Sequence, residues 1–129
     1  MKKEVIATDQ APLAIGTYSQ AIKVNGMVFI SGQIPFDPQT MTPVAGNMDK
    51  QINQVFSNLK AITYAAGGDL SMIVKLTIFL TNLDDFEAVN KGMSVFFEPP
   101  FPARAVVGVA SLPKDVSIEV DAILALADL

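Results

Sequence analysis

The segment Val116–Ala127 most constrains how this chain of 129 residues can fold. Alternate positions place one apolar set on a single face of a strand: Ile118, Val120, Ala122, Leu124 and Leu126. The other face begins with Glu119 and Asp121 and continues with Ile123 and Ala125. A strand that is apolar on both faces is usually covered on both. The segment is therefore predicted to be the last strand of a sheet that has cover on each side.

The other predicted strands are Glu4–Ala7, Ile22–Val24, Met27–Ile30, Val74–Leu80 and Arg104–Ala110. Asn25-Gly26 separates the second strand from the third, and this pair favours a type I′ hairpin turn. The segment Ser31–Pro35 ends the third strand, and residues 11–19 and 36–46 are predicted to be loops. Residues 111–115 would then join the last two strands in a second hairpin.

Two segments have the periodicity of one-sided helices. From about Asp49, one apolar face carries Ile52, Val55, Phe56, Leu59, Ile62 and Ala66, and Gly67-Gly68 ends the helix. In the second helix Asp84 is the expected N-cap, with Glu87 completing a capping box and Pro99-Pro100 terminating the segment. Its apolar stripe is Phe86, Val89, Met93, Phe96 and Phe97.

The element order β-β-β-α-β-α-β-β predicts a single two-layer α+β domain over residues 1–129. Two helices cover one face of a mixed sheet, so the other face needs a partner. We therefore expect the chain to form an oligomer through the open face of the sheet.

Composition excludes several classes of function. The chain has no histidine and no cysteine, so imidazole bases, thiol nucleophiles and thiolate or histidine metal sites are impossible. The net charge is -4 and the lysines are scattered, which argues against nucleic acid as a partner. No signal-peptide core follows Lys2-Lys3, and no apolar run is long enough to span a membrane, so a cytoplasmic protein is expected.

Arg104 is the only arginine, and it stands directly before the apolar run 105–110. A guanidinium there must stay solvated or meet an anion that offsets its desolvation. One interpretation is a bidentate clamp on a substrate carboxylate, for which guanidinium is better suited than ammonium. The other is a structural salt bridge to Glu119 or Asp121.

Four further positions carry candidate chemistry. Glu119 interrupts an apolar strand, so it is either a general base with a raised pKa or one half of an ion pair. Tyr18 is either a substrate-facing phenol or a loop aromatic packed on the core. Ser31-Gly32 permits close approach of a ligand to the backbone or marks a bulge, and Asn90 is either a ligand donor or a solvated helix residue.

A hairpin between the last two strands would set Glu119 nearer to Gly108 than to Arg104. The offset between Glu119 and Arg104 is then roughly 13 Å along the strand at ~3.3 Å per residue. We expect the two residues to meet through a substrate, or across a subunit boundary, rather than directly.

Four segments together resemble the RidA family, also called the YjgF family. They are Gly16–Ala21, Ser31–Pro35, Phe101–Arg104 and Leu112–Val120, and they occur in the order and spacing of that family. The resemblance extends from about Ile6 to Ala125. It implies a chorismate-mutase-like α+β fold and a homotrimer whose sheets form a central barrel, with a ligand cleft at each subunit interface.

The resemblance also implies a reaction and a set of roles. RidA proteins hydrolyse 2-aminoacrylate or its imine, and the related 2-iminobutanoate, to a 2-oxo acid and ammonia without metal or organic cofactor. Arg104 matches the arginine that binds the substrate carboxylate, and Glu119 matches the glutamate associated with the attacking water. Tyr18 matches the cleft tyrosine, Ser31 and Gly32 the segment that offers backbone groups, and Asn90 a cleft-lining asparagine.

Three positions depart from the family pattern. Val106 replaces a frequent cysteine, Thr17 replaces a frequent proline, and the link Glu98–Pro100 is shorter than in many members. Two other functions stay open. One is a regulator that binds 2-oxo acids in the same cleft without turnover, although Glu119 favours the enzyme. The other is a chorismate mutase, but the dicarboxylate substrate of that reaction needs several cationic side chains, and the chain has a single arginine.

Overall fold

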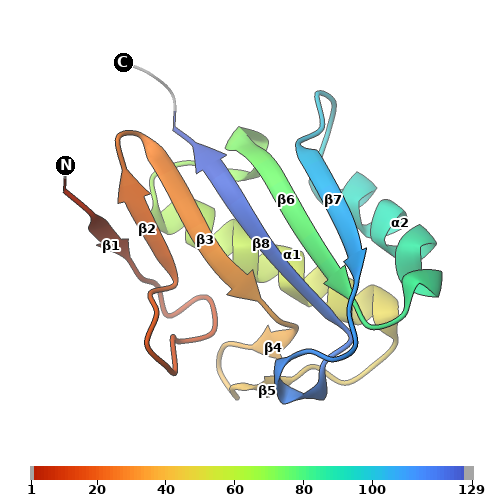
Figure 1. Ribbon diagram of the computed structural model, residues 1–129. Helices are drawn as coiled ribbons and strands as arrows, with labels where there is room; N and C mark the ends of the chain where they lie inside the picture. Colours follow the sequence, from red (N-terminus) through yellow and green to blue (C-terminus); the bar gives the residue numbers. More distant parts are fainter. Residues whose placement is uncertain (1, 127–129) are drawn as a thin grey trace.

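The computed structural model describes residues 2–126, and its centre is a mixed sheet of six strands (Figure 1). The strand order across the sheet is β1-β2-β3-β8-β6-β7, and all pairs are antiparallel except β6 with β7. The strands are β1 (Glu4–Ile6), β2 (Ala21–Val24), β3 (Met27–Gln33), β6 (Ile73–Leu80), β7 (Ala103–Gly108) and β8 (Ile118–Ala125). Ala127, the end of the predicted last strand, lies outside the described residues.

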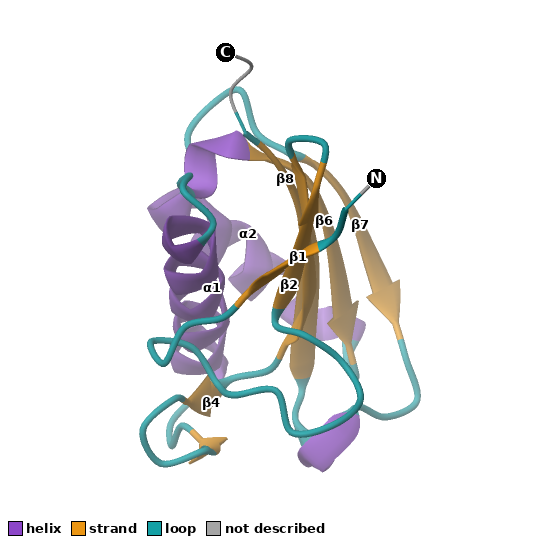
Figure 2. Ribbon diagram, turned by 90° about the vertical axis from the view of Figure 1, so that its left-hand side faces the viewer, coloured by secondary structure: helices purple, strands orange, loops and turns teal. Residues whose placement is uncertain are grey.

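Two helices, α1 (Met48–Ala65) and α2 (Phe86–Phe96), cover the same face of this sheet (Figure 2). The two-layer α+β class predicted from the sequence is therefore confirmed. The core lies between the layers, where the apolar stripe of α1 meets the inward side chains of β3, β6 and β8. Within the described residues, no helix has the length and apolar character needed to cross a membrane.

The first helix agrees closely with its predicted extent. Asn47 caps its N-terminus, where the side chain accepts a hydrogen bond of 3.1 Å from Lys50 N. Gly67, with a φ of +92°, follows the C-terminal residues in a conformation that L side chains rarely adopt.

The predicted N-cap of the second helix is wrong. Asn82, rather than Asp84, supplies the capping side chain: it accepts a hydrogen bond of 2.9 Å from Asp84 N and begins a 3-10 turn, Leu83–Asp85. The helix proper starts at Phe86, and Asp85 at its N-cap makes no side-chain hydrogen bond there. The side chain that caps this segment is therefore Asn82, and Asp84 supplies its backbone N–H to that cap.

The β2–β3 hairpin is confirmed in its turn and in its register. Asn25 and Gly26 have φ values of +50° and +77°, as a type I′ turn requires, and Val24 pairs with Met27. The predicted loop 36–46 contains a further small hairpin formed by β4 (Phe36–Asp37) and β5 (Thr42–Pro43).

The predicted hairpin between the last two strands is wrong. β7 lies at the edge of the sheet and pairs in parallel with β6, after the crossover through α2. β8 instead enters between β3 and β6 and is antiparallel to both. A strand–helix–strand unit favours a parallel pair, and β8 takes a central position in which both its edges are paired and its Ile118, Val120 and Leu124 face is buried under the helices.

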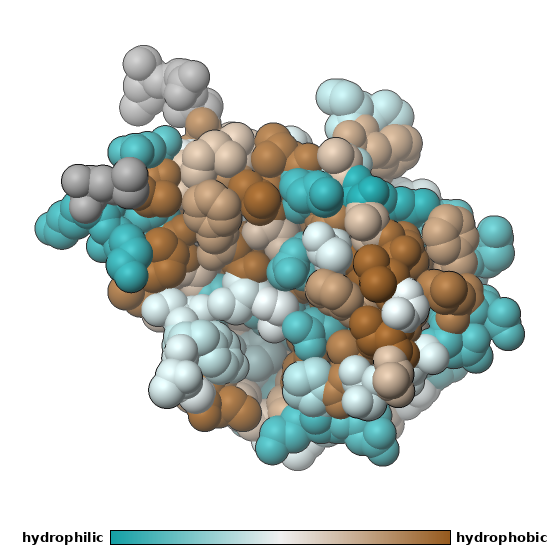
Figure 3. Space-filling view, in the orientation of Figure 1, coloured by the Kyte–Doolittle hydropathy of each residue, from teal (hydrophilic) through white to brown (hydrophobic). Residues whose placement is uncertain are grey.

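The face of the sheet that the helices leave uncovered carries two apolar areas (Figure 3). Phe29 of β3 is 46% exposed on one side and Val107 of β7 is 40% exposed on the other. Between these two apolar areas the open face carries polar side chains, namely Lys75 and Thr77 of β6 and Asp121 of β8. The single chain thus leaves an apolar surface, divided by a polar strip, without cover.

Two buried amides fix the loops at the lower edge of the sheet in Figure 1. Asn58 of α1 donates from Nδ2 to the carbonyl oxygens of Ile34 and Phe36, at 3.2 and 3.0 Å. Gln20 donates from Nε2 to Pro12 O at 2.7 Å and accepts from Thr8 N at 2.7 Å. These hydrogen bonds hold in place the loop before β2 and the segment that follows β3.

We expect Asn58→Leu to destabilise the chain by about 1–3 kcal/mol, because the buried Phe36 carbonyl loses its donor. Asn53→Leu, on the exposed side of the same helix, is the matched control and should change stability by no more than about 0.5 kcal/mol. Denaturant unfolding of both variants measures the difference. A loss for Asn58→Leu as small as that of the control would contradict this role.

Candidate active site

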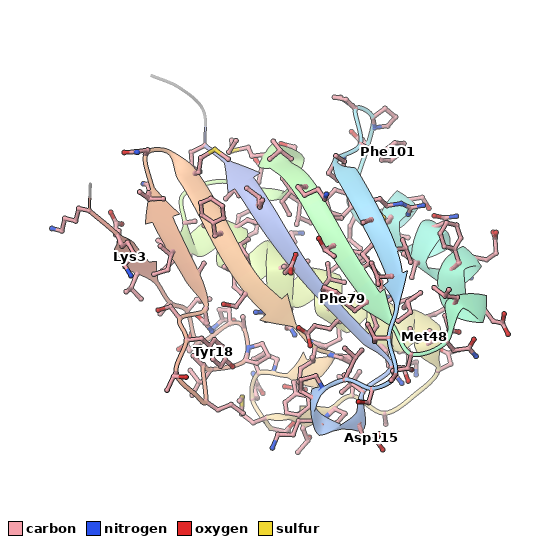
Figure 4. All side chains as sticks on the ribbon, viewed as in Figure 1. Lys3, Tyr18, Met48, Phe79, Phe101 and Asp115 are labelled. Carbon is pink, nitrogen blue, oxygen red and sulfur yellow. The ribbon has the colours of Figure 1, made fainter. Side chains whose placement is uncertain are left out.

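A pocket of about 400 Å³ lies where β3 ends and β8 begins. Four of the six predicted site residues line it: Tyr18, Ser31, Gly32 and Glu119. They come from three separate segments, namely the loop before β2, the end of β3 and the start of β8. Figure 4 shows Tyr18 and Asp115, which follows the lining residue Lys114, at the same edge of the sheet.

Gly32 and Glu119 are in direct contact across the β3–β8 pair. The register between Ile30–Gln33 and Ala122–Val120 shifts by one residue, so β3 has a bulge at Ser31-Gly32. A Cβ atom built on Gly32 would lie 2.8 Å from Glu119 Cδ and closer still to one carboxyl oxygen. Glycine at this position therefore leaves room for the Glu119 carboxyl group against the backbone of the bulge.

The environment of Glu119 favours its protonated form. Burial raises the pKa of the Glu119 carboxyl above its ordinary value, and the nearby charge of Asp121 raises it further. Burial also raises the pKa of Asp121, while hydrogen bonding by Thr77 and the charge of Lys75 lower it. A carboxyl group with a raised pKa, half-buried in a pocket, is suited to accept and return a proton.

The hydroxyl-bearing residues of the pocket are held by the loop before β2. Ser31 Oγ donates to Ser19 O at 2.6 Å, and Ser31 N donates to Gln20 O at 2.9 Å. Tyr18 is 50% exposed and lines the pocket instead of packing in the core, and its Oη accepts a weak bond of 3.4 Å from Ile15 N. The phenol is thus free to face a ligand.

Arg104 and Asn90 lie outside this pocket. Arg104 pairs with Leu76, a fully buried residue, and its side chain extends along the helix-covered side of edge strand β7. There its guanidinium lies 5.2 Å from the ring centroid of Phe86, and Nη1 is 3.2 Å from Met93 Sδ. Asn90 is four residues after Phe86 and three before Met93, so it belongs to the same face of α2.

Glu119 and Arg104 therefore belong to opposite faces of the sheet. Glu119 pairs with Phe79 on the open face, three residues along β6 from Leu76, the partner of Arg104, and one strand separates β8 from β7. The two backbones are then about 14 Å apart, from ~3.3 Å per residue along the strands and ~4.8 Å between strands.

A salt bridge from Arg104 to Glu119 or Asp121 within the chain is contradicted by this geometry. Among residues 2–126 the ion pair is instead Lys91–Asp49, on the surface at 3.4 Å. The same residues contain no group of three or more acidic side chains that could hold a metal ion.

Most of the pocket wall consists of residues that no sequence pattern singled out. Lys114 lines it from a turn where Lys114 and Asp115 both have positive φ, near +57° and +58°. The position of Lys114 in the turn just before Glu119 is the one sequence feature that could have indicated that it lines the pocket. The apolar lining includes Leu13, Ile15, Ile34, Phe36 and Met41. These residues have no periodic pattern, and only the tertiary fold brings their loops together.

Comparisons with known proteins agree on one family. A family model described as endoribonuclease L-PSP matches residues 8–126. The chain is 44% identical to the 2-iminobutanoate/2-iminopropanoate deaminase of Dermatophagoides farinae, over 96% of this chain and 97% of that protein.

Solved structures are similarly close. The crystal structure of RidA from the Antarctic bacterium Psychrobacter sp. has 49% identity and a TM-score of 0.92, covering 95% of this chain and 99% of that one. E. coli TdcF with bound serine has 42% identity and a TM-score of 0.91, covering 96% and 99%.

We expect Gly32→Ala to move the Glu119 carboxyl toward solvent and thereby to lower its raised pKa toward the ordinary value. An NMR titration of the labelled Glu119 carboxyl carbon measures this shift. Gly16→Ala is the control, because a Cβ there would make only ordinary contacts, at 3.4 Å or more, with the Tyr18 ring.

The raised pKa also has a consequence for stability. The folded chain keeps a proton on Glu119 that the unfolded chain has already lost, so this group makes the free energy of unfolding fall as pH rises from the ordinary value through the raised one. In the NMR titration, an ordinary pKa for Glu119 in the wild type would contradict the contact between Gly32 and the Glu119 carboxyl group. The same pKa in the wild type and in Gly32→Ala would also contradict it.

Proposed function

The chain belongs to the RidA family, and we propose that it is a hydrolytic deaminase of reactive enamine and imine intermediates. Its substrates would be 2-aminoacrylate with its tautomer 2-iminopropanoate, and 2-iminobutanoate. The observation that carries this proposal is the Glu119 carboxyl, which lies against Gly32 in a pocket and has a raised pKa. A related protein named as a deaminase of these same imines supports the assignment.

The family description names an endoribonuclease, but this chain is poorly equipped to bind RNA. Its net charge is -4, and Lys114 is the one cation among the described residues that line the pocket. Binding a phosphate backbone requires clustered lysine or arginine side chains. Imine hydrolysis requires only one cation for a carboxylate and one group that moves a proton.

In the proposed assembly, three chains form a homotrimer of the chorismate-mutase-like type, with the open sheet faces turned inward as a barrel. The uncovered apolar areas around Phe29 and Val107 support such burial. The opposite-face placement of Arg104 and Glu119 supports a shared site. In that site Arg104, with Asn90 beside it, completes the pocket that a neighbouring chain forms with Tyr18, Ser31, Gly32 and Glu119.

The reaction needs one water and one proton carrier. Arg104 binds the substrate carboxylate as a bidentate pair, and Tyr18 with the Ser31-Gly32 segment orients the imine. The Glu119 carboxylate accepts a proton from water while the water oxygen bonds to the carbon of the protonated imine, and the electron pair of the C=N π bond moves to nitrogen. Glu119 then returns its proton to the amino nitrogen of the tetrahedral adduct. The C–N bond breaks as the Glu119 carboxylate takes the proton of the adduct's hydroxyl group, and that proton leaves with the ammonia as ammonium, so that the 2-oxo acid is released and the carboxylate is restored.

The scheme uses no cofactor and no thiol. Val106, at the position of the frequent family cysteine, is half-buried and packs against the core. Activity with valine at this position is therefore expected.

We expect Arg104→Ala to lower kcat/KM for 2-iminopropanoate generated in situ by at least about thirtyfold, because the substrate carboxylate loses its paired charge. Arg104→Lys keeps the positive charge but loses the bidentate geometry, so its kcat/KM should lie between those of the wild type and Arg104→Ala. Release of 2-oxo acid above the spontaneous rate is the measurement. Equal rates in wild type and Arg104→Ala would overturn the hydrolase proposal, and binding of 2-oxobutanoate without turnover would favour a regulator.

Mixed trimers test whether neighbouring chains share the site. Arg104→Ala and Glu119→Gln are each expected to be inactive alone. In an equal mixture each mixed trimer regains one complete site, so about a quarter of wild-type activity should return. Wild-type protein should sediment at three times the mass of the 13.8 kDa chain. Mixtures proven by mass spectrometry to have exchanged chains, yet without recovered activity, would contradict the shared site.

A further inference from the structure

We propose that Lys114 is a binding residue of the same site, and that its ammonium group attracts the anionic 2-imino acid to the pocket beside Glu119. The inference rests on the proposed function, because it takes the substrate to be an anion. It comes from two independent features of Lys114, namely the backbone conformation that it adopts and the pocket that it lines.

The turn before β8 has a backbone conformation that lysine disfavours. Lys114 and Asp115 have φ values of +57° and +58°, and Val116 N donates to Pro113 O at 3.4 Å. A turn with positive φ at both central residues is of type I′, and Asn-Gly and Asp-Gly are the pairs that favour it. Aspartate adopts the left-handed region more readily than most residues, whereas a lysine there is unusual.

The hairpin turn between β2 and β3 provides a comparison within the same chain. Its central residues also both have positive φ, and they are Asn25 and Gly26, the pair that this conformation favours. Lys114 departs from that rule, and within residues 2–126 no ion pair holds its ammonium group in return. Backbone strain without such a compensating contact is typical of positions where function determines the residue.

The pocket indicates what that function is. Of the described residues that line it, Lys114 and Glu119 carry charge, and Lys114 is the cation. Burial and the charge of Asp121 raise the pKa of Glu119, so the ammonium group does not serve to keep that carboxyl ionised. The positive charge of Lys114 is therefore left to act on a ligand.

A cation at this place matters because the chain is acidic. Its net charge of -4 opposes the approach of a carboxylate. In the proposed assembly Arg104 comes from a neighbouring chain, so Lys114 is the cation that the chain carrying Glu119 itself supplies. Its attraction acts on the substrate carboxylate before and during the reaction alike, so it should strengthen binding without accelerating the chemical step.

We expect Lys114→Gln to raise the Kd for 2-oxobutanoate about fivefold at low ionic strength and to lower kcat/KM for 2-iminopropanoate by the same factor. Lys114→Arg keeps the positive charge and should restore both values. Lys60→Gln, which removes the same charge from an exposed position of α1 outside the pocket, is the control and should change neither. Calorimetry measures the Kd, and release of 2-oxo acid above the spontaneous rate measures kcat/KM.

Salt provides a second readout that a structural role of Lys114 would not change. The Debye length falls from about 30 Å at about 0.01 M salt to about 3 Å at about 1 M. The difference in Kd between the wild type and Lys114→Gln should therefore largely disappear at the higher concentration. A difference of the same size at both concentrations would overturn the electrostatic role.

Lys114→Gly separates the backbone conformation from the charge. Glycine adopts positive φ without strain, so the denaturant midpoint should rise above that of the wild type at equal protein concentration. The ammonium group is lost, so the Kd for 2-oxobutanoate should rise as it does in Lys114→Gln. A Lys114→Gly variant that binds this acid as tightly as the wild type would overturn the proposal.

The outcomes separate this inference from the proposed function. Turnover by the wild type, with the same Kd and kcat/KM in Lys114→Gln, overturns the role of Lys114 and leaves the deaminase proposal standing. Binding of 2-oxobutanoate that depends on Lys114, without turnover of the imine, overturns the deaminase proposal and supports the anion-binding role. Neither binding nor turnover in the wild type overturns both proposals.

Discussion

The position of β8 in the middle of the sheet is the constraint on which the rest of the molecule depends. Its inward side chains Ile118, Val120 and Leu124 are fully buried under the helices, and both its edges are paired, to β3 and to β6. Because side chains alternate along a strand, the same placement puts Glu119 on the opposite face. The bulge in β3 then lets the backbone of Gly32 meet the Glu119 carboxyl, so one strand both closes the core and sets the acidic group of the pocket.

The parallel pairing of β7 with β6 has an equally direct consequence for function. It puts Arg104 at the sheet edge, on the helix side, where the ring of Phe86 and the sulfur of Met93 flank the guanidinium instead of a carboxylate. A single chain thus separates Arg104, the proposed anion-binding group, from Glu119, the proposed proton carrier. In the proposed assembly, a second chain would bring the two groups together and would also cover the apolar areas of the open face. The proposed assembly and the proposed chemistry therefore both rest on the same topology.

Local patterns in the sequence predicted much of this fold, and non-local pairing accounts for what they missed. The Asn25-Gly26 turn and the stripe of α1 depend on neighbouring residues, and both were predicted correctly. The order of β7 and β8 depends on a crossover through α2, and the shorter assumption of a hairpin was wrong. In the pocket, Tyr18, Ser31, Gly32 and Glu119 were identified and lie together. The face that carries Arg104 and the apolar wall with Ile15 follow only from strand pairing and loop packing.

The central claim is that one site is built from two chains, with Arg104 from one and Glu119 from the other. The most direct test is a crystal structure of the protein with 2-oxobutanoate, the product of the proposed reaction. We expect a ligand carboxylate paired with Arg104 of one subunit, and a carbonyl carbon in the pocket beside Glu119 of its neighbour. A ligand bound beside Glu119 with no arginine from a neighbouring chain, or bound at Arg104 away from every Glu119, would contradict it.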